Sequence, residues 1–379
     1  MPRQARIMPG MFESASPILG QDRALEILQS ALNSGRFHHA WIFSGPKGVG
    51  KFTTAMRLAR VLLDPELRAL PDALTNPSRL GHESRIQQQI TQGTHPDLHI
   101  IRKELVLYSE DSKLRDKKQT NIPIDLLRER VIGGKAGETI HEAAAYRTAM
   151  LGHGKVFIID EAELLAREAQ NAMLKTLEEP PPQTWFFLIT SQPEDLYATI
   201  HSRCQQVRFG RLDEKAMKQW LKEQKSEVGG QMSASEQVWA LEFAEGSPGV
   251  AVVAMEYDFA EWQAKLDPML ADLWRGKFPV QMGATLGELA DAFAKAWVAN
   301  HKNASKDAAN KDATRHLFAL LAAHARKQLA ALNDDVERWA VAIDLLAEAE
   351  RQLDSNVNMK LLLDNLTVQW NQALSGVPA

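Results

Sequence analysis

The feature that most constrains the fold is a glycine-rich segment between a short apolar run and a helical pattern. The run Trp41–Phe43 is followed by Gly45–Lys51, which reads GPKGVGK. Residues 52–63 then repeat apolar side chains at helical spacing. Strand, loop and helix in this order are typical of an α/β protein in which the loop lies at the carboxyl edge of a parallel sheet.

The segment matches the pattern G-x-x-x-x-G-K, which predicts a cradle for nucleotide phosphates. Gly45, Gly48 and Gly50 allow the backbone to approach a phosphate and to point successive N–H groups at it. The amino end of the following helix adds partial positive charge, and Lys51 is expected to reach the β and γ phosphates. A simple glycine-rich turn is the alternative.

The residue after the lysine departs from the pattern. A serine or threonine hydroxyl should ligate Mg²⁺ there, but this chain has Phe52, which cannot bind a metal. Thr53 follows, and one helical position is about 100° of rotation, so its hydroxyl should point elsewhere. Phosphoryl transfer depends on the metal. We therefore expect weak or absent ATP hydrolysis and a weak or vestigial site for ATP or ADP with Mg²⁺, unless Thr53 or a water compensates.

Two further apolar runs place candidate site residues at strand ends. Residues 156–159 precede Asp160-Glu161, and residues 185–189 precede Thr190-Ser191. Asp160 is expected to hold Mg²⁺ and Glu161 to polarise the attacking water, although the pair could instead cap the next helix. Thr190 or Ser191 could sense a γ-phosphate, and either could equally be a turn residue. With a helix expected over 163–178, these runs predict a parallel sheet buried on both faces.

The rest of the chain is less specific. Residues 64–121 read as a polar insertion, whose basic stretch 113–118 is either a solvated loop or a DNA-backbone contact. After Phe209 strong helix formers dominate. Apolar stripes in the last part predict the core of a helical bundle; they comprise Leu317, Leu320, Leu321 and His324, and Trp339, Ala342, Ile343 and Leu346.

Composition excludes several classes of protein. The 44 basic and 48 acidic residues give a net charge of −4, so the chain has no overall attraction for nucleic acid or an anionic membrane. The single cysteine, Cys204, allows neither an intramolecular disulfide nor a cysteine-rich zinc site. The longest apolar run, 317–323, is far shorter than the roughly 20 residues of a membrane span. We expect a cytoplasmic protein that does not contact a membrane.

Several segments together resemble the bacterial AAA+ clamp-loader family. Residues 171–180 read NAMLKTLEEP and residues 200–204 read IHSRC, which contains the family's Ser-Arg-Cys motif. Leu19-Gly20-Gln21 and residues 35–40 resemble the segments before the loop in the same family. The matches span about residues 18–209 in family order, whereas the C-terminal part matches only in being helical and of suitable length.

The resemblance implies three domains: a P-loop AAA+ α/β domain over 1–208, a small helical lid over 209–266 and a helical collar over 267–379. It also implies a hetero-pentameric ring with motor (gamma/tau) and delta subunits of DNA polymerase III, which loads a sliding clamp on primer–template DNA during replication. The chain itself should carry no polymerase active site. The family's four-cysteine zinc module cannot form here, so no zinc is expected.

Within that family, the residues favour the delta-prime branch over the ATP-hydrolysing motor branch. Phe52 replaces the metal-binding hydroxyl, Gly249 stands where the lid motif of motor subunits carries an arginine, and no long tail follows the third domain. The resemblance implies that Arg203 reaches the ATP of a neighbouring subunit as a trans arginine finger; a surface salt bridge is the alternative. A working motor, or an AAA+ adaptor outside replication, are the other functions left open.

Overall fold

The computed structural model describes residues 17–76, 78–79, 84–116, 119–224, 233–301, 304–331, 336–355 and 357–375. The chain divides into two compact units, one of residues 1–230 with 244–250 and one of residues 231–243 with 251–379. The three-domain division stays a prediction. Among the described residues, no helix is long and apolar enough to cross a membrane.

The first unit is built around a five-stranded sheet in the order β2-β5-β6-β1-β7, with every neighbouring pair parallel. The strands are β1 (Ala40–Ser44), β2 (Leu98–Ile101), β5 (Lys155–Ile159), β6 (Thr184–Thr190) and β7 (Gln205–Arg208). Every residue of β1, β5 and β6 is buried. The predicted α/β fold class with a parallel sheet is therefore confirmed.

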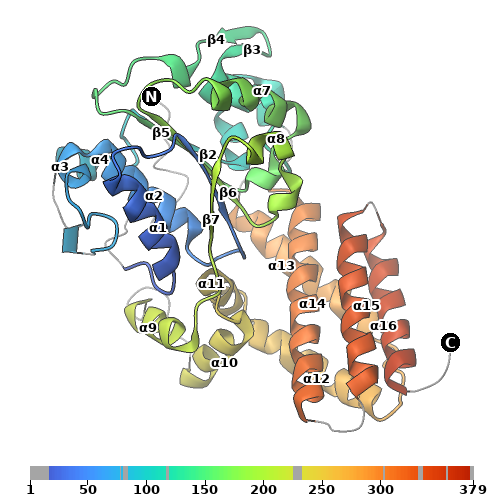
Figure 1. Ribbon diagram of the computed structural model, residues 1–379. Helices are drawn as coiled ribbons and strands as arrows, with labels where there is room; N and C mark the ends of the chain where they lie inside the picture. Colours follow the sequence, from blue (N-terminus) through green and yellow to red (C-terminus); the bar gives the residue numbers. More distant parts are fainter. Residues whose placement is uncertain are drawn as a thin grey trace. The chain divides into compact units, whose positions relative to one another are not determined.

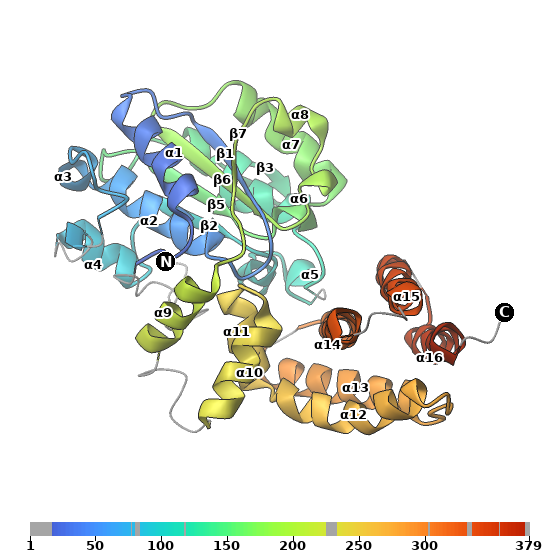
Figure 2. The same cartoon turned by 60° about the horizontal axis from the view of Figure 1, so that its bottom comes forward.

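Helices cover both faces of this sheet. Figures 1 and 2 show α1 and α2 (blue) on one face and α7 and α8 (green) on the other. The helices of this unit are α1 (Asp22–Asn33), α2 (Lys51–Leu63), α3 (Pro65–Arg68), α4 (Arg85–Thr91), α5 (Ser112–Arg115), α6 (Ile124–Leu127), α7 (Arg167–Glu178), α8 (Ala198–His201) and α9 (Glu214–Gln224). Short 3₁₀ or π turns cover Lys103–Tyr108, Arg128–Ile132, Ala144–Tyr146, Ala162–Leu164 and Pro193–Asp195.

Alternation along the strands explains the two-sided core. Ile42 of β1, Phe157 of β5 and Leu188 of β6 join the core cluster that includes Met173 of α7. The intervening strand residues, such as Phe187, are fully buried on the opposite face, and α2 contacts β5 and β6. Both faces are apolar, as buried parallel sheets require.

The structure corrects two expectations in this unit. Residues 64–121 are not only a polar insertion, because they contain β2, the edge strand that pairs with β5. The helix expected over 163–178 begins only at Arg167, after the 3₁₀ turn Ala162–Leu164. A small antiparallel hairpin, β3 (Gly134–Ala136) with β4 (Thr139–His141), was not predicted. Of the basic stretch 113–118, Lys117 and Lys118 lie outside the described residues.

The second unit is helical, as predicted. Its helices are α12 (Phe259–Trp274), α13 (Met282–Asn300), α14 (Lys306–Ala331), α15 (Val336–Asp354) and α16 (Met359–Ser375), while α10 (Ala234–Ala244) and α11 (Pro248–Glu256) are each divided between the units. Figure 2 looks along α15 and α16, which pack side by side. Leu317, Leu320, Leu321, Trp339, Ala342 and Leu346 are buried, which confirms the predicted bundle core.

Candidate functional site

The loop between β1 and α2 has the backbone form that a phosphate cradle needs. Gly50, the residue before α2, has φ +100°, a conformation that other residues rarely adopt. A Cβ added at Gly50 would meet no atom within 4 Å, so the space beside this backbone is open. The free N–H groups of the first turn of α2 follow immediately, as in other anion sites at helix amino ends.

Lys51 lies folded against this same loop. Its Nζ donates hydrogen bonds of 2.6 Å to the carbonyls of Gly45 and Pro46. Burial lowers the pKa of Lys51 to about 8, an effect that the nearby carboxylates of Glu163 and Asp160 partly oppose. An anion entering the cradle would therefore meet an ammonium group that must first leave two carbonyls.

The ring of Phe52, in α2, is covered by the guanidinium of Arg102, the residue that follows β2. The guanidinium of Arg102 lies 4.2 Å from the centroid of the Phe52 ring, within the range of a cation–π contact. Thr53 follows in the first turn of α2 and is half-buried, whereas the next hydroxyl, that of Thr54, donates to the Gly50 carbonyl at 2.9 Å. The position after the lysine is thus apolar and already covered.

The acidic pair at the end of β5 is neutralised by the basic pair at the end of β2. Ile101 of β2 lies opposite Ile159 of β5 in the sheet, so Arg102 and Lys103 emerge beside Asp160 and Glu161. Arg102 contacts Asp160 at 2.5 Å and Lys103 contacts Glu161 at 2.7 Å. Burial raises the pKa of Asp160, and the charge of Arg102 works against that rise.

The end of β6 carries a hydroxyl–carboxylate contact. Ser191 donates from Oγ to Glu163 Oε1 at 2.6 Å and from its backbone N–H at 3.2 Å. The hydroxyl of Thr190 accepts the backbone N–H of Gln192 at 3.0 Å, which is a turn contact. Ser191 and Glu163 therefore form the polar group at this strand end, and Glu163 was not predicted from the sequence.

A segment at the start of α11 closes over the loop. Ser247 Oγ donates to the Lys47 carbonyl at 2.7 Å, and the Gly249 N–H donates to the Gly48 carbonyl at 2.9 Å. A Cβ at Gly249 would lie 2.6 Å from the Gly48 Cα, which real structures do not tolerate. The place expected for a lid arginine thus accepts only glycine in this arrangement.

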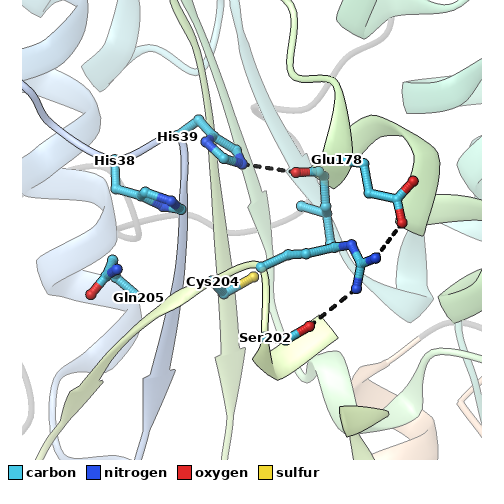
Figure 3. A pocket seen from close by; sticks show the side chains of 8 residues that line it. His38, His39, Glu178, Ser202, Cys204 and Gln205 are labelled. Atoms are coloured by element: carbon cyan, nitrogen blue, oxygen red, sulfur yellow. Dashed lines mark hydrogen bonds and ion pairs between the residues drawn. The ribbon is translucent and has the colours of Figure 1, made fainter. Parts of the chain in front are cut away.

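Arg203 lies in a different part of the first unit, in a pocket of about 480 Å³. Its side chain is about 31% exposed and pairs with Glu178 at the end of α7, which is about 47% exposed. One guanidinium nitrogen also donates to the Thr199 carbonyl at 2.8 Å and to Ser202 Oγ at 3.1 Å. Figure 3 shows Glu178 and Ser202 joined to this guanidinium, with His38 and His39 across the pocket.

Cys204 lines the same pocket, and its environment does not favour a nucleophile. Burial raises the pKa of its thiol to about 12, so the reactive thiolate is scarce at neutral pH. His39 is held by a 2.9 Å hydrogen bond from Nε2 to the Leu177 carbonyl, and burial lowers its pKa.

The comparisons with known proteins identify the family. Residues 20–213, just over half of the chain, match the family model described as DNA polymerase III, delta subunit. The chain belongs to this family.

Individual relatives agree with that placement. DNA polymerase III subunit delta′ of Escherichia coli is 32% identical over 244 residues, which cover 63% of this chain and 60% of that protein. Subunit delta′ of Bacillus subtilis is 32% identical over 54% of this chain and 52% of its own length. The E. coli tau subunit is 34% identical over 53% of this chain and 26% of its own length. The chain thus spans less than two thirds of the relatives it matches.

A gamma subunit-related protein from Thermotoga maritima is similar in structure. It covers 92% of this chain and 99% of its own, at 17% identity and a TM-score of 0.40.

The residues of this delta-family chain fit the phosphates of a nucleotide but not its Mg²⁺ ion. The open backbone at Gly50 and the ammonium of Lys51 suit phosphate. The two groups expected to face the metal are Phe52, which has no ligating atom, and Asp160, which is paired with Arg102. Among the described residues, no three His, Cys, Asp or Glu side chains are grouped to hold a metal ion; the expectation of no zinc stays a prediction.

Proposed function

We propose that this chain is the delta-prime-type stator of a bacterial clamp loader. It would act in the cytoplasm within a hetero-pentamer of motor (gamma/tau) and delta subunits that loads the sliding clamp on primer–template DNA. Membership of the polymerase III delta family and similarity to delta′ and tau proteins support this role. The bundle of α12–α16 would supply most of the collar that joins the subunits.

The chain's own nucleotide site would not hydrolyse ATP at a useful rate. The metal hydroxyl is replaced by Phe52, and both acidic residues at the end of β5 already have cationic partners. Efficient phosphoryl transfer needs a metal that neutralises developing charge. The nucleotide site is therefore proposed to be weak or vestigial.

The site that would act on the neighbouring subunit, Arg203, would be intact. Arg203 is partly exposed and is held by one exposed carboxylate, one carbonyl and one hydroxyl. Exposed ion pairs of this kind contribute about 0–1 kcal/mol to stability, so little free energy is needed to release the guanidinium from Glu178. The observation that carries the proposal is this contrast within one unit: a blocked metal position beside the P-loop and an available arginine after α8.

The test is Arg203→Ala in a clamp loader reconstituted with motor and delta subunits. A trans arginine in related NTPases is worth about 10³–10⁵ in rate, so ATP hydrolysis at the motor site next to this chain should fall by at least about 10²-fold and lower the DNA-stimulated ATPase of the complex. Gel filtration should show an unchanged complex. Arg147→Ala, which removes another exposed arginine of the same unit, is the matched control and should leave the rate unchanged. An unaltered ATPase in Arg203→Ala would remove the finger role.

The motor alternative makes a different prediction for the isolated chain. Robust ATP turnover that Lys51→Ala abolishes would show that Thr53 or an altered metal shell replaces the missing hydroxyl. We expect no such turnover. An adaptor outside replication, in turn, would stay apart from motor and delta subunits during co-purification, whereas the stator should assemble with them.

A further inference from the structure

Arg102 lies between the two positions that would face a metal ion in a working P-loop. One is the residue after the P-loop lysine, here Phe52, and the other is the acid at the end of β5, here Asp160. The guanidinium is 4.2 Å from the Phe52 ring centroid and 2.5 Å from the Asp160 carboxylate. A single side chain therefore touches both.

The sheet itself fixes this arrangement. Because Ile101 is in register with Ile159, the residue that follows each of them lies at the same edge of the sheet. The backbone N–H of Asp160 also donates to the Ile101 carbonyl at 3.0 Å. Arg102 and Asp160 are only 10% and 17% exposed as side chains. The pair is thus built into the core edge and is not a chance surface contact.

We propose that Arg102 is an internal substitute for the divalent cation, so that this site excludes Mg²⁺ and accepts nucleotide phosphates only without metal. Arginine suits the place because its planar guanidinium stacks on an aromatic ring and binds a carboxylate at its edge. Mg²⁺ suits it poorly, since it demands oxygen ligands at about 2.0–2.1 Å in near-octahedral geometry. Phe52 offers none.

Metal binding and the observed arrangement exclude each other. For Mg²⁺ to reach Asp160, Arg102 would have to leave a largely buried carboxylate and the face of Phe52. Its charge would also repel the ion if it stayed nearby. The positive charge toward a bound ligand then comes from Lys51, the loop N–H groups and Arg102, which suits the free polyanion of a nucleoside diphosphate.

The experiment is calorimetric titration of the full chain with ADP, in excess Mg²⁺ and in excess EDTA. The unmodified chain should bind ADP no more tightly with Mg²⁺ than with EDTA. The double variant Phe52→Thr/Arg102→Gln restores a hydroxyl and frees Asp160, so it should bind ADP at least tenfold more tightly with Mg²⁺. The single variant Phe52→Thr is the matched control: it keeps Arg102 and should gain no affinity for ADP from Mg²⁺.

Three results would overturn the proposal. The first is that the unmodified chain binds ADP at least tenfold more tightly with Mg²⁺ than with EDTA. This measurement needs no variant, so it tests the proposal even if the double variant fails to fold. The second is a folded double variant without metal preference. The third is no ADP binding by any of the proteins in either medium, because the cradle would then not accept phosphate. The inference rests on the proposal of a non-hydrolysing site, but this test uses the isolated chain and is independent of the Arg203 measurement in the complex.

Discussion

Two arginine–carboxylate pairs in the same unit have similar chemistry and different surroundings. Arg102 with Asp160 is 10% and 17% exposed and is covered by an aromatic ring, whereas Arg203 with Glu178 is 31% and 47% exposed and opens on a pocket. Burial makes the first pair hard to break, because either partner alone would be a desolvated charge. The second can open and close in water. The same type of ion pair is thus hard to separate between Arg102 and Asp160 and easy to separate between Arg203 and Glu178.

The largest expected difference is in stability. Arg102→Ala leaves Asp160 buried without its partner and should lower the free energy of unfolding by about 3–5 kcal/mol. Arg203→Ala should cost less than about 1 kcal/mol. Urea unfolding of both variants at pH 7 measures this. Adding Asp160→Asn to Arg102→Ala removes the stranded charge and should recover part of the loss. Equal losses in the two single variants would show that burial does not separate the pairs.

Acid should weaken the β2 side of the sheet. His99 of β2 stacks on Phe157 at 4.5 Å between ring centroids, and burial lowers its pKa to about 4. The unfolded chain, with a histidine pKa of about 6.5, binds more protons between these values. The free energy of unfolding therefore falls as the pH drops from about 6.5 to 4, by up to about 3 kcal/mol from this group.

His99→Phe keeps the ring stack and removes this titration. Its unfolding free energy, followed by urea titration across the same pH range, should fall less steeply than that of the unmodified chain. The carboxylates that also titrate there are common to both proteins, so the difference between the two curves isolates His99. Parallel curves would show that His99 does not titrate differently in the folded state.

Gly249, in the segment that covers the phosphate cradle, should tolerate no side chain. Gly249→Ala puts a Cβ 2.6 Å from the Gly48 Cα, and a clash with backbone of this kind costs about 1–3 kcal/mol. The control is Gly287→Ala in α13, where the added Cβ meets nothing within 4 Å; alanine should stabilise that helix by about 0.5–1 kcal/mol. Thermal unfolding compares the two. A stabilising Gly249→Ala would mean that this segment does not press on the loop.

The sequence was a good guide to whatever depends on neighbouring residues. The loop Gly45–Lys51, the strands β5 and β6 and the bundle faces each depend on local spacing, and the structure has them where they were expected. The start of α7 was misjudged because the turn Ala162–Leu164 interrupts the apolar pattern only briefly. Such local errors move a boundary without changing the fold.

Arg102 was missed for a different reason. It is far from Asp160 in sequence, and only the pairing of β2 with β5 brings the two together. A signal was present: Ile100-Ile101 is followed by Arg102-Lys103, as Ile158-Ile159 is followed by Asp160-Glu161. Opposite charges after two apolar runs predict a contact once the two runs are known to be adjacent strands. Here β2 lay within the stretch that was expected to be a polar insertion. Glu163 was likewise missed, because only the fold brings it within hydrogen-bond distance of Ser191.

The smallest expected effect concerns the exposed pair, Arg203 with Glu178. Glu178→Gln removes the carboxylate that pairs with Arg203. In the proposed finger role, the arginine would then no longer have to break this ion pair before it acts. Since such pairs contribute at most about 1 kcal/mol, ATP hydrolysis at the motor site next to this chain should rise about two- to fivefold and increase the DNA-stimulated ATPase of the reconstituted complex, while stability should change by less than about 1 kcal/mol. Glu179→Gln changes the next exposed carboxylate and should have no effect on the rate. A fall in ATPase as large as that of Arg203→Ala would mean that Glu178 positions the arginine for the reaction and does not merely hold it at rest.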